Sequence, residues 1–393
     1  MLIGSFCYSQ NLQSYIDVAI SNNPEIQKFD FQYKIALEKI EEVNSLPNTE
    51  FSAGVMALAP KMEMPMERFK ISAMQMLPWF GTLSSRKDYA ASMAESEYAE
   101  VNIAKRKLAR SISQLYYLLY EIRAKQEVLL KNIKLLETYE QLALTSIEVG
   151  QASAVDVLRL QIRQNELQQK IDVLKEENKG IQAAMNSLLN RPFDEEITIF
   201  STLIIPENDV TLNYERLSIH PELIQYEKIY NSVEQLELLN QKERKPVIGI
   251  GLEYINMKDS PMITSSYKDM LMPMFSLSVP IFNKKFSSQT KQNKLKLKEI
   301  EAQKKERLNS LQADLSKAIA LRNQAKIKFD TQAKNLKQAK DAEEILIKNY
   351  ETGSINFNDV LDIQELQLKF QMNQIESVQT YYVQQSIVNY FIQ

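Results

Sequence analysis

The stretch that decides the fold is residues 101–136, VNIAKRKLARSISQLYYLLYEIRAKQEVLLKNIKLL. Its apolar residues recur mostly at intervals of three or four, close to the 3.5-residue repeat of a coiled coil. They are Val101, Ala104, Leu108, Ile112, Leu115, Leu119, Ile122, Leu129, Ile133 and Leu136. The surrounding chain from Leu83 to Ile147 contains neither proline nor glycine. At about 1.5 Å per residue, this predicts a helix roughly 100 Å long.

A second helical run, at 155–189, follows Gly150 and ends before a proline. Because the two runs are separated by only a few residues, they predict an antiparallel helical hairpin. The same plan recurs later in the chain, where 284–349 is again free of proline and glycine. Gly353 follows this stretch, and 356–390 is expected to form the second return helix.

Short motifs that recur at a nearly constant spacing indicate that the chain is a tandem repeat of two units of about 200 residues. Short motifs recur at offsets of 197, 202 and 203 residues. The pairs are NPEI at 23–26 with HPEL at 220–223, LPWFG at 77–81 with VPIFN at 279–283, and EVG at 148–150 with ETG at 351–353. We therefore divide the chain into a signal-like segment at 1–9, a first unit at 10–190, a linker at 191–218 and a second unit at 219–393.

Each unit also contains a pair of strand-like segments, at about 50–78 and 247–280, between a short helix and the long hairpin (about 82–190 and 284–390). Apolar residues alternate there with small or polar ones, which is typical of a membrane β-strand. Soluble strand pairs packed on a helix are the alternative. Four strands cannot close a barrel, and an open sheet edge is not viable in lipid. A membrane role therefore requires several copies of the chain.

The composition argues against an enzyme and against nucleic-acid binding. The 47 Lys and Arg residues nearly balance the 50 Asp and Glu residues. A single Cys excludes a disulfide framework or a Cys-based zinc site, and a single His puts Ser-His-Asp catalysis out of easy reach. We expect no cofactor. No run of 18 apolar residues is present, so the sequence predicts no membrane-spanning helix.

Two short features leave alternatives open. The first nine residues are similar to the end of a secretory signal, although a frayed apolar terminus or lipidation at Cys7 would also fit. His220 aligns with Asn23 of the first unit, directly before a proline that opens a helix. We therefore favour an N-terminal capping role for His220 over metal binding.

Across essentially the whole chain, the duplicated motifs resemble the TolC-type outer-membrane efflux proteins. The resemblance rests on the NPEI helix start, on Gln75-x-x-Pro78-x-Phe80-Gly81, and on Gly150-x5-Asp156-Val157-Leu158. It implies a mainly α fold with a membrane β segment: a homotrimer with a 12-stranded β-barrel on a 12-helix periplasmic α-barrel.

The function that the resemblance implies is a passive exit duct in the outer membrane of a Gram-negative bacterium. Such a duct contacts outer-membrane lipid, a periplasmic adaptor (membrane fusion protein) and an inner-membrane RND-type transporter, and together they form a tripartite pump. A periplasmic coiled-coil adaptor or structural scaffold is the alternative. An enzyme that uses carboxylates is the least favoured class.

The resemblance also implies site residues near the hairpin turns Gly150 and Gly353, at the periplasmic tip. Carboxylates that converge in a narrow pore repel one another and bind counter-ions. Alternatively, these aspartates cap or solvate the return helices. Ile355 stands where some members carry an arginine that holds the tip closed. The expected constriction residues are Asp156, Tyr350, Asp359 and Asp362.

Two further groups lie around the strands. The strand-to-helix junctions are expected at the membrane interface, with packing at the barrel neck as the alternative. They comprise Pro78, Trp79, Phe80, Gly81, Pro280 and Phe282.

Methionines gather in the strand pairs and their loops, and thioethers are soft ligands for Cu(I) or Ag(I), although adaptable packing is the favoured explanation. Candidate contacts are Met62, Met64, Met66, Met270, Met272 and Met274. The resemblance leans toward the heavy-metal efflux subgroup, so the expected cargo is heavy-metal ions or small toxic compounds.

Overall fold

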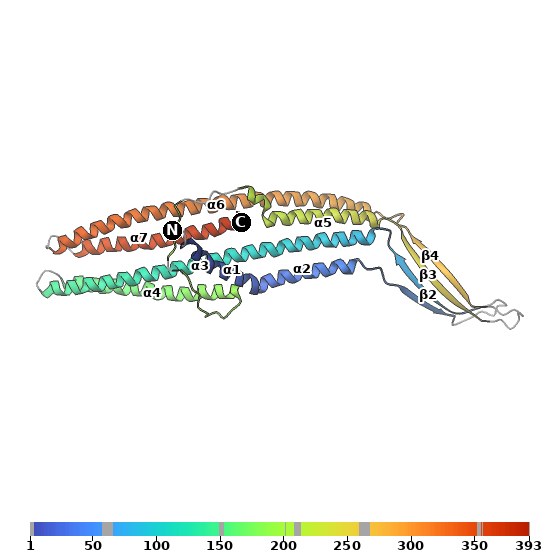
Figure 1. The fold of residues 1–393 in the computed structure, drawn as a ribbon, viewed down its shortest axis with the longest axis horizontal. Helices are drawn as coiled ribbons and strands as arrows, with labels where there is room; N and C mark the ends of the chain where they lie inside the picture. Colours follow the sequence, from blue (N-terminus) through green and yellow to red (C-terminus); the bar gives the residue numbers. More distant parts are fainter. Residues whose placement is uncertain are drawn as a thin grey trace. The chain divides into compact units, whose positions relative to one another are not determined.

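The computed structural model shows long helices and, within the residues it describes, one four-stranded sheet (Figure 1). The described residues are 4–56, 66–148, 153–200, 202–207, 214–258, 268–351, 355 and 357–392. A predominantly helical chain with a few antiparallel strands confirms the predicted mainly α fold class.

The elements follow one another twice in the same order. Each set has a short helix, two strands, a 67-residue helix and a 36-residue return helix. The first set is α2 (Pro24–Val43), β1 (Glu50–Val55), β2 (Met66–Leu77), α3 (Thr82–Glu148) and α4 (Ala154–Leu189). The second set is α5 (Pro221–Glu243), β3 (Val247–Lys258), β4 (Met270–Ser278), α6 (Lys285–Glu351) and α7 (Phe357–Ile392). The equal helix lengths agree with the duplicated motifs in the sequence.

Two described elements fall outside this double pattern, namely α1 (Gly4–Asn22) and the 3-10 helix η1 (Tyr214–Ile219). Neither was expected from the sequence. Helix α1 includes Cys7 and most of the segment that we interpreted as signal-like. Processing of that segment and lipidation of Cys7 stay hypotheses. Helix η1 lies at the boundary between the linker and the second repeat.

The chain packs into two compact units, each built from parts of both repeats. We call them the hairpin unit (Met1–Lys28, Asn102–His220 and Arg307–Gln393) and the sheet unit (Phe29–Val101 and Pro221–Glu306). In the hairpin unit, α4 runs beside the later part of α3, and α7 runs beside the later part of α6 (Figure 1). The packing units therefore cut across the sequence repeats.

In the sheet unit, the strands lie in the order β1-β2-β3-β4, all antiparallel. The central pair joins β2 of the first repeat to β3 of the second. Residues opposite one another share a face, so Phe51, Ala73 and Leu252 form one row of apolar side chains. The neighbouring row, on the other face, contains Ser72 and Glu253. The predicted alternation thus gives the sheet one apolar and one mixed face.

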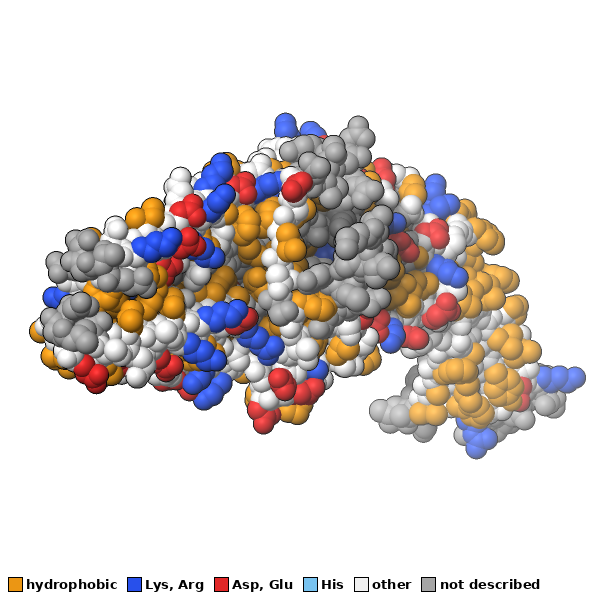
Figure 2. All heavy atoms as spheres, turned by 60° about the vertical axis from the view of Figure 1, so that its left-hand side comes forward, with side chains coloured by type: hydrophobic (Ala, Val, Ile, Leu, Met, Phe, Trp, Pro, Cys, Tyr) orange, Lys and Arg blue, Asp and Glu red, His pale blue; other side chains and the backbone are white. Residues whose placement is uncertain are grey.

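The apolar face of the sheet is open to solvent in this chain. Phe51 is 77% exposed, Phe275 is 80% exposed and Leu277 is 65% exposed. Hydrophobic side chains gather over the strands in the space-filling view (Figure 2). Because soluble monomers rarely leave a large apolar patch uncovered, this face is expected to meet lipid or another chain.

One apolar core joins the two hairpins inside the hairpin unit. It combines side chains from α3, α4 and α7, and Leu160 at its centre is fully buried. Its buried members are Leu129, Leu136, Tyr139, Ala143, Val157, Leu160, Leu167, Ile171, Phe357, Val360 and Leu368. The apolar seams of the coiled-coil pattern thus pack hairpin against hairpin as well as helix against helix.

Among the described residues, no helix combines the length and apolar character that crossing a membrane requires.

Candidate functional site

The end of the first hairpin is fixed by a capping box at the start of α4. The Ser153 side chain accepts a hydrogen bond from Val155 N (3.2 Å), and Asp156 Oδ2 accepts one from Ser153 N (3.3 Å). This satisfies backbone donors that a helix start otherwise leaves unpaired. Asp156 therefore takes the capping role that we kept as its alternative, and a place in a pore constriction stays a prediction. The turn residue Gly150 lies outside the described residues.

The end of the second hairpin is built around aromatic side chains. The rings of Tyr350 and Phe357 lie 5.0 Å apart, and Tyr139 of α3 meets Phe357 edge to face at 5.9 Å. The buried Tyr350 hydroxyl has no hydrogen-bond partner within the described part of the chain. Tyr350 thus packs on the core at this end. Gly353 lies outside the described residues.

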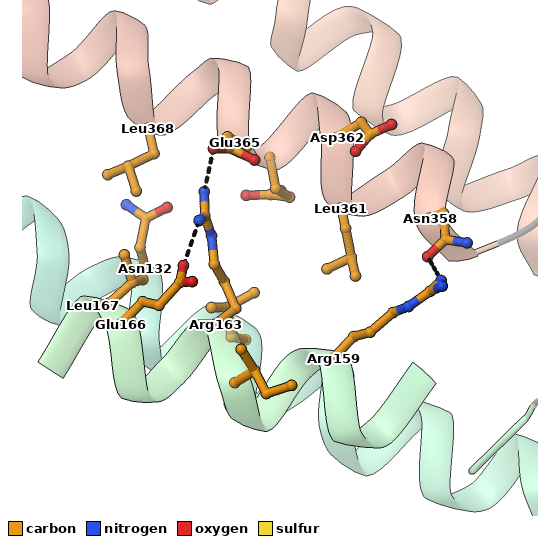
Figure 3. Close-up of a pocket in the computed structure, with 13 residues that line it drawn as sticks. Asn132, Arg159, Arg163, Glu166, Leu167, Asn358, Leu361, Asp362, Glu365 and Leu368 are labelled. Carbon is orange, nitrogen blue, oxygen red and sulfur yellow. Dashed lines mark hydrogen bonds and ion pairs between the residues drawn. The ribbon is translucent and has the colours of Figure 1, made fainter. Parts of the chain in front are cut away.

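The two predicted constriction aspartates of α7 are exposed. Asp359 lies in the first turn of α7, and Asp362 lies one turn further along. Asp362 lines a groove of about 280 Å³ between α4 and α7, whereas Asp359 is absent from its lining (Figure 3). Both carboxylates are thus accessible to ions in this chain. Their convergence in a pore stays a prediction.

Two arginines of α4 cross that groove to α7 (Figure 3). Arg159 donates a hydrogen bond to the Asn358 side chain. Arg163 pairs with Glu166 of its own helix (2.7 Å) and with Glu365 of α7 (2.8 Å). The hairpin ends are therefore joined by polar contacts as well as by the shared core.

The forked contact of Arg163 affects its charge state. Burial lowers the pKa of the Arg163 guanidinium, but the hydrogen bonds with Glu166 and Glu365 outweigh burial and leave the pKa raised. The guanidinium stays charged, and its planar fork suits two carboxylates at once. Arg163 therefore acts as a bridge whose strength depends on both acids.

A buried polar network lies deeper in the same unit. The Tyr139 hydroxyl donates to Glu343 Oε1 (2.7 Å), and the Gln367 amide donates to Glu343 Oε2 (2.6 Å). Gln364 donates to the Tyr139 hydroxyl (3.2 Å). Burial raises the pKa of Tyr139, and the hydrogen bond to Glu343 raises it further. This network links α3 of the first hairpin to both helices of the second.

The sequence analysis missed Arg159, Arg163 and Glu365, although the repeat carried a signal for them. At the 203-residue offset, Arg159 aligns with Asp362, so equivalent positions carry opposite charges. Ile162 aligns with Glu365, so an uncharged position of the first copy is acidic in the second. The sign change from Arg159 to Asp362 is a difference that two copies facing each other across an interface would favour. Arg159 and Arg163 supply contacts with α7 close in sequence to Ile355.

The strand-to-helix junctions differ between the repeats. Gly81 has a φ of +81°, which favours glycine, whereas its counterpart Asn283 has no positive φ and accepts a hydrogen bond from Lys285 N (2.8 Å). Beside them, Phe80 is 83% exposed and Phe282 is 98% exposed. Exposed rings at the junctions are compatible with membrane anchoring, which stays a prediction for these rings. The same holds for the half-buried Pro78, Trp79 and Pro280.

The candidate metal ligands are only partly described. Met62 and Met64 lie outside the described residues, and Met66 opens β2. Met270, Met272 and Met274 occupy alternate positions of β4 and therefore share one face. No group of three or more His, Cys, Asp or Glu side chains within the described ranges is arranged to hold a metal ion.

The single histidine packs against the end of α7. His220 is buried, and its Nε2 lies 3.1 Å from the carbonyl oxygen of Tyr390 near the end of α7. Its ring meets Tyr390 edge to face at 5.0 Å. In the first repeat, Asn23 accepts a hydrogen bond from Glu25 N (2.8 Å) and caps α2. The position that caps α2 in the first repeat thus carries, in the second repeat, a histidine that contacts α7. Capping of α5 by His220 stays a prediction.

Comparison with solved structures relates this geometry to outer-membrane channels. The structure of CusC, from work on folding and transmembrane channel formation, matches with a TM-score of 0.80 at 12% identity, covering 98% of this chain and 92% of that chain. The outer-membrane channel OprN gives 0.81 at 14%, covering 98% and 90%. The outer membrane protein VceC from Vibrio cholerae gives 0.77 at 14%, covering 98% and 97%.

No family model and no curated protein matches the chain. At 12–14% identity the structural likeness shows the fold. The chain has the fold of the TolC-like outer-membrane channels. The resemblance read from the duplicated motifs is thereby confirmed at the level of fold.

Proposed function

We propose that this protein is the outer-membrane exit duct of a tripartite efflux pump, a passive channel rather than an enzyme. The observation that carries the proposal is the four-stranded sheet of the sheet unit. Among the residues that the structure describes, its edge strands β1 and β4 each have a neighbour on one side only, and its apolar face is exposed. Lipid tolerates an apolar face but not an open edge, so further chains must pair with both edges.

Three copies meet this requirement in the simplest way. A closed cyclic arrangement pairs β4 of each copy with β1 of the next, and three four-stranded sheets supply a 12-stranded barrel. The long helices would surround a water-filled bore in the periplasm. Structures that share this fold are described as outer-membrane channels, which supports the same location in a Gram-negative bacterium.

The proposed route runs from an inner-membrane RND-type transporter and a periplasmic adaptor through the duct to the outside. Asp359 and Asp362 would face the bore near the hairpin ends, with Tyr350 behind them. Cargo of heavy-metal ions or small toxic compounds fits a duct whose selectivity is set mainly by the transporter. The Arg163 bridge would hold the hairpin ends of one copy together.

The second candidate function is a periplasmic coiled-coil adaptor or a structural scaffold. It accounts for the long helices and for the shared core of the hairpin unit. It gives no reason for a sheet whose exposed face carries Phe51 and Phe275. The exposed apolar face therefore favours the duct.

Edge-to-edge cross-linking tests the proposal directly. In a Cys7→Ser background, Ser52→Cys on edge strand β1 is combined in turn with Met272→Cys, Met274→Cys and Ser276→Cys on edge strand β4. Oxidation of outer-membrane fractions should give covalent species up to a trimer for at least one pair, and native mass spectrometry should give a trimer mass.

The matched control places both cysteines inside one sheet, by changing Ser72 and Glu253, which are opposite each other in β2 and β3. This pair should close within a single chain and give no ladder. A folded monomer in the membrane, or a ladder that continues beyond three chains, would contradict the trimeric duct.

A further inference from the structure

Methionines stand beside glycines in two neighbouring rows of the sheet. The strand register sets the two rows, both on the mixed face: Met74, Gly251 and Met274 in one, and Met76, Gly249 and Ser276 in the other. The rows therefore bring three thioethers to one patch of that face. Between β2 and β4 lies β3, which has a glycine, and so no side chain, in each row. We call Met74, Met76 and Met274 the thioether patch.

The glycines leave room that the methionines use. The Met74 sulfur lies 3.0 Å from the position a Cβ would take on Gly251 and 3.2 Å from the corresponding position on Gly249. The Met76 sulfur lies 2.8 Å from that same position on Gly249. Both sulfurs thus fold over the backbone of β3 and lie close to a single point of it.

Met274 approaches this space from the other side. Met274 on β4 lies opposite Gly251 on β3, and Met74 on β2 lies opposite the same glycine on its other side. Because neighbouring strands lie about 4.8 Å apart, the backbones of Met74 and Met274 are about 10 Å apart. A methionine side chain is long and flexible enough for sulfurs on the two strands to converge over the glycine between them.

The chemistry of the patch is selective. Thioether sulfur is a soft, uncharged ligand that prefers Cu(I) over hard cations such as Mg²⁺ or Ca²⁺, and Ag(I) shares that softness. The Ser276 hydroxyl lies 3.9 Å from the Met76 sulfur and donates to it, which restrains that side chain. On the same face, Lys70 is paired with Glu253 at 3.5 Å, so its charge is partly balanced.

We propose that the thioether patch binds one soft monovalent cation, Cu(I) or Ag(I), on the mixed face of the sheet. The site lies on the strands and does not depend on the loop methionines Met62 and Met64. Binding follows from the geometry of one sheet, whereas a role as a contact point during metal export rests on the proposed duct function. All three side chains are half-buried, so an ion reaches them without unfolding the sheet.

Silver binding to the full-length protein in detergent tests the site. Ag(I) in chloride-free nitrate buffer is titrated by isothermal calorimetry, and X-ray absorption at the silver edge identifies the ligand atoms. The parent should bind one Ag(I) per chain with sulfur in the first coordination shell. Changing Met74, Met76 and Met274 to Leu should weaken binding by more than about tenfold.

A matched variant carries the same three changes on helices, at Met93, Met185 and Met372. It should bind silver as the parent does. Trimer yield and circular dichroism should be unchanged in both variants, because leucine nearly matches methionine in volume and hydrophobicity. If the triple variant of the patch yields little folded protein, the three single leucine variants provide the same test, each with weaker silver binding.

Unchanged silver affinity in the patch variants, or a first shell of oxygen and nitrogen, would overturn the proposal. Pore conductance of the parent in planar bilayers separates this result from failure of the duct. If the parent conducts ions but binds silver without the three methionines, the proposed site is contradicted and the duct function is not. A parent that binds silver through the patch but forms no pore leaves the site standing and removes the duct.

Discussion

The two hairpins carry the same carboxylate–glutamine arrangement, but the glutamines are buried in only one of the two copies. In the first hairpin, Glu140 accepts hydrogen bonds from Gln161 (2.7 Å) and Gln164 (2.9 Å) near the surface. At an offset of 203 residues, Glu343 accepts one from Gln367 (2.6 Å), and this glutamine is only 6% exposed, although Glu140 and Glu343 are both half-buried. The glutamines at equivalent positions therefore differ in burial, whereas the two carboxylates do not.

Tyr139 makes the difference between the two copies. It comes from the first hairpin, is only 7% exposed, and donates to Glu343 of the second. Its counterpart in the second repeat is Ala342, which has no hydroxyl to offer Glu140. One tyrosine thus turns a contact within a hairpin into a contact between hairpins. The two copies share the same helices, and differences at single positions make them complementary.

The largest effect is expected from removing the carboxylate in each copy. Glu343→Ala leaves the buried Tyr139 hydroxyl without its acceptor and leaves the Gln367 amide with the Ala339 carbonyl alone, which should cost about 1–3 kcal/mol of unfolding free energy. Glu140→Ala exposes its glutamines to water and should cost less than about 0.5 kcal/mol. Urea unfolding followed by far-UV circular dichroism measures both. Equal losses would mean that burial does not distinguish the two networks.

Alkaline pH should sharpen the same comparison through Tyr139. Its pKa is raised by burial and by Glu343, so as pH rises above about 10 the unfolded chain ionises first and stability falls. Tyr139→Phe removes this contribution, which amounts to at most about 1.4 kcal/mol per pH unit. The slope of unfolding free energy between neutral and alkaline pH should therefore be shallower in the variant. A slope identical to that of the parent would assign the alkaline loss to other tyrosines.

Most of the secondary structure could be predicted because local signals fixed it. The run without proline or glycine placed the first long helix at 83–147, and the structure gives Thr82–Glu148. Period-two alternation likewise found the strands. Helix α1 was missed because its first residues are similar to a signal segment.

The hairpin-to-hairpin contacts could not be derived in the same way. Which residue of α4 meets which residue of α7 depends on how two helices slide and rotate against each other, and a helical period fixes neither. The charge reversal from Arg159 to Asp362 was visible in the sequence, but its partner Asn358 was not. Asp156 shows the same limit, because Ser153 and a pore are equally compatible with its position in the sequence.

A smaller effect is expected from the bridge between the hairpin ends. Changing Arg163 to Gln and Glu365 to Gln, singly and together, forms a double-mutant cycle. The coupling free energy should be about 0.2–1 kcal/mol, since Glu365 is mostly exposed, and it should fall as salt rises. The control cycle uses Lys131 and Glu127, an ion pair within α3. Zero coupling at low salt would mean that the core alone holds the hairpins together.

The smallest structural effect, with the most direct functional readout, is expected from the aspartates of the two return helices. Asp359 and Asp362 are exposed on α7, whereas Asp156 caps α4 by accepting from Ser153 N. Changing Asp359 and Asp362 together to Ala removes two carboxylates and the side-chain bulk that we propose faces the bore. In planar bilayers, single-channel conductance should therefore rise and block by multivalent cations should weaken.

Asp156→Ala should instead lower stability by about 1 kcal/mol, the usual cost of a lost cap, and leave cation block unchanged. If Asp156→Ala relieved the block and the Asp359 and Asp362 changes did not, the constriction would belong to the first repeat, and the two hairpins would have exchanged the roles assigned to them.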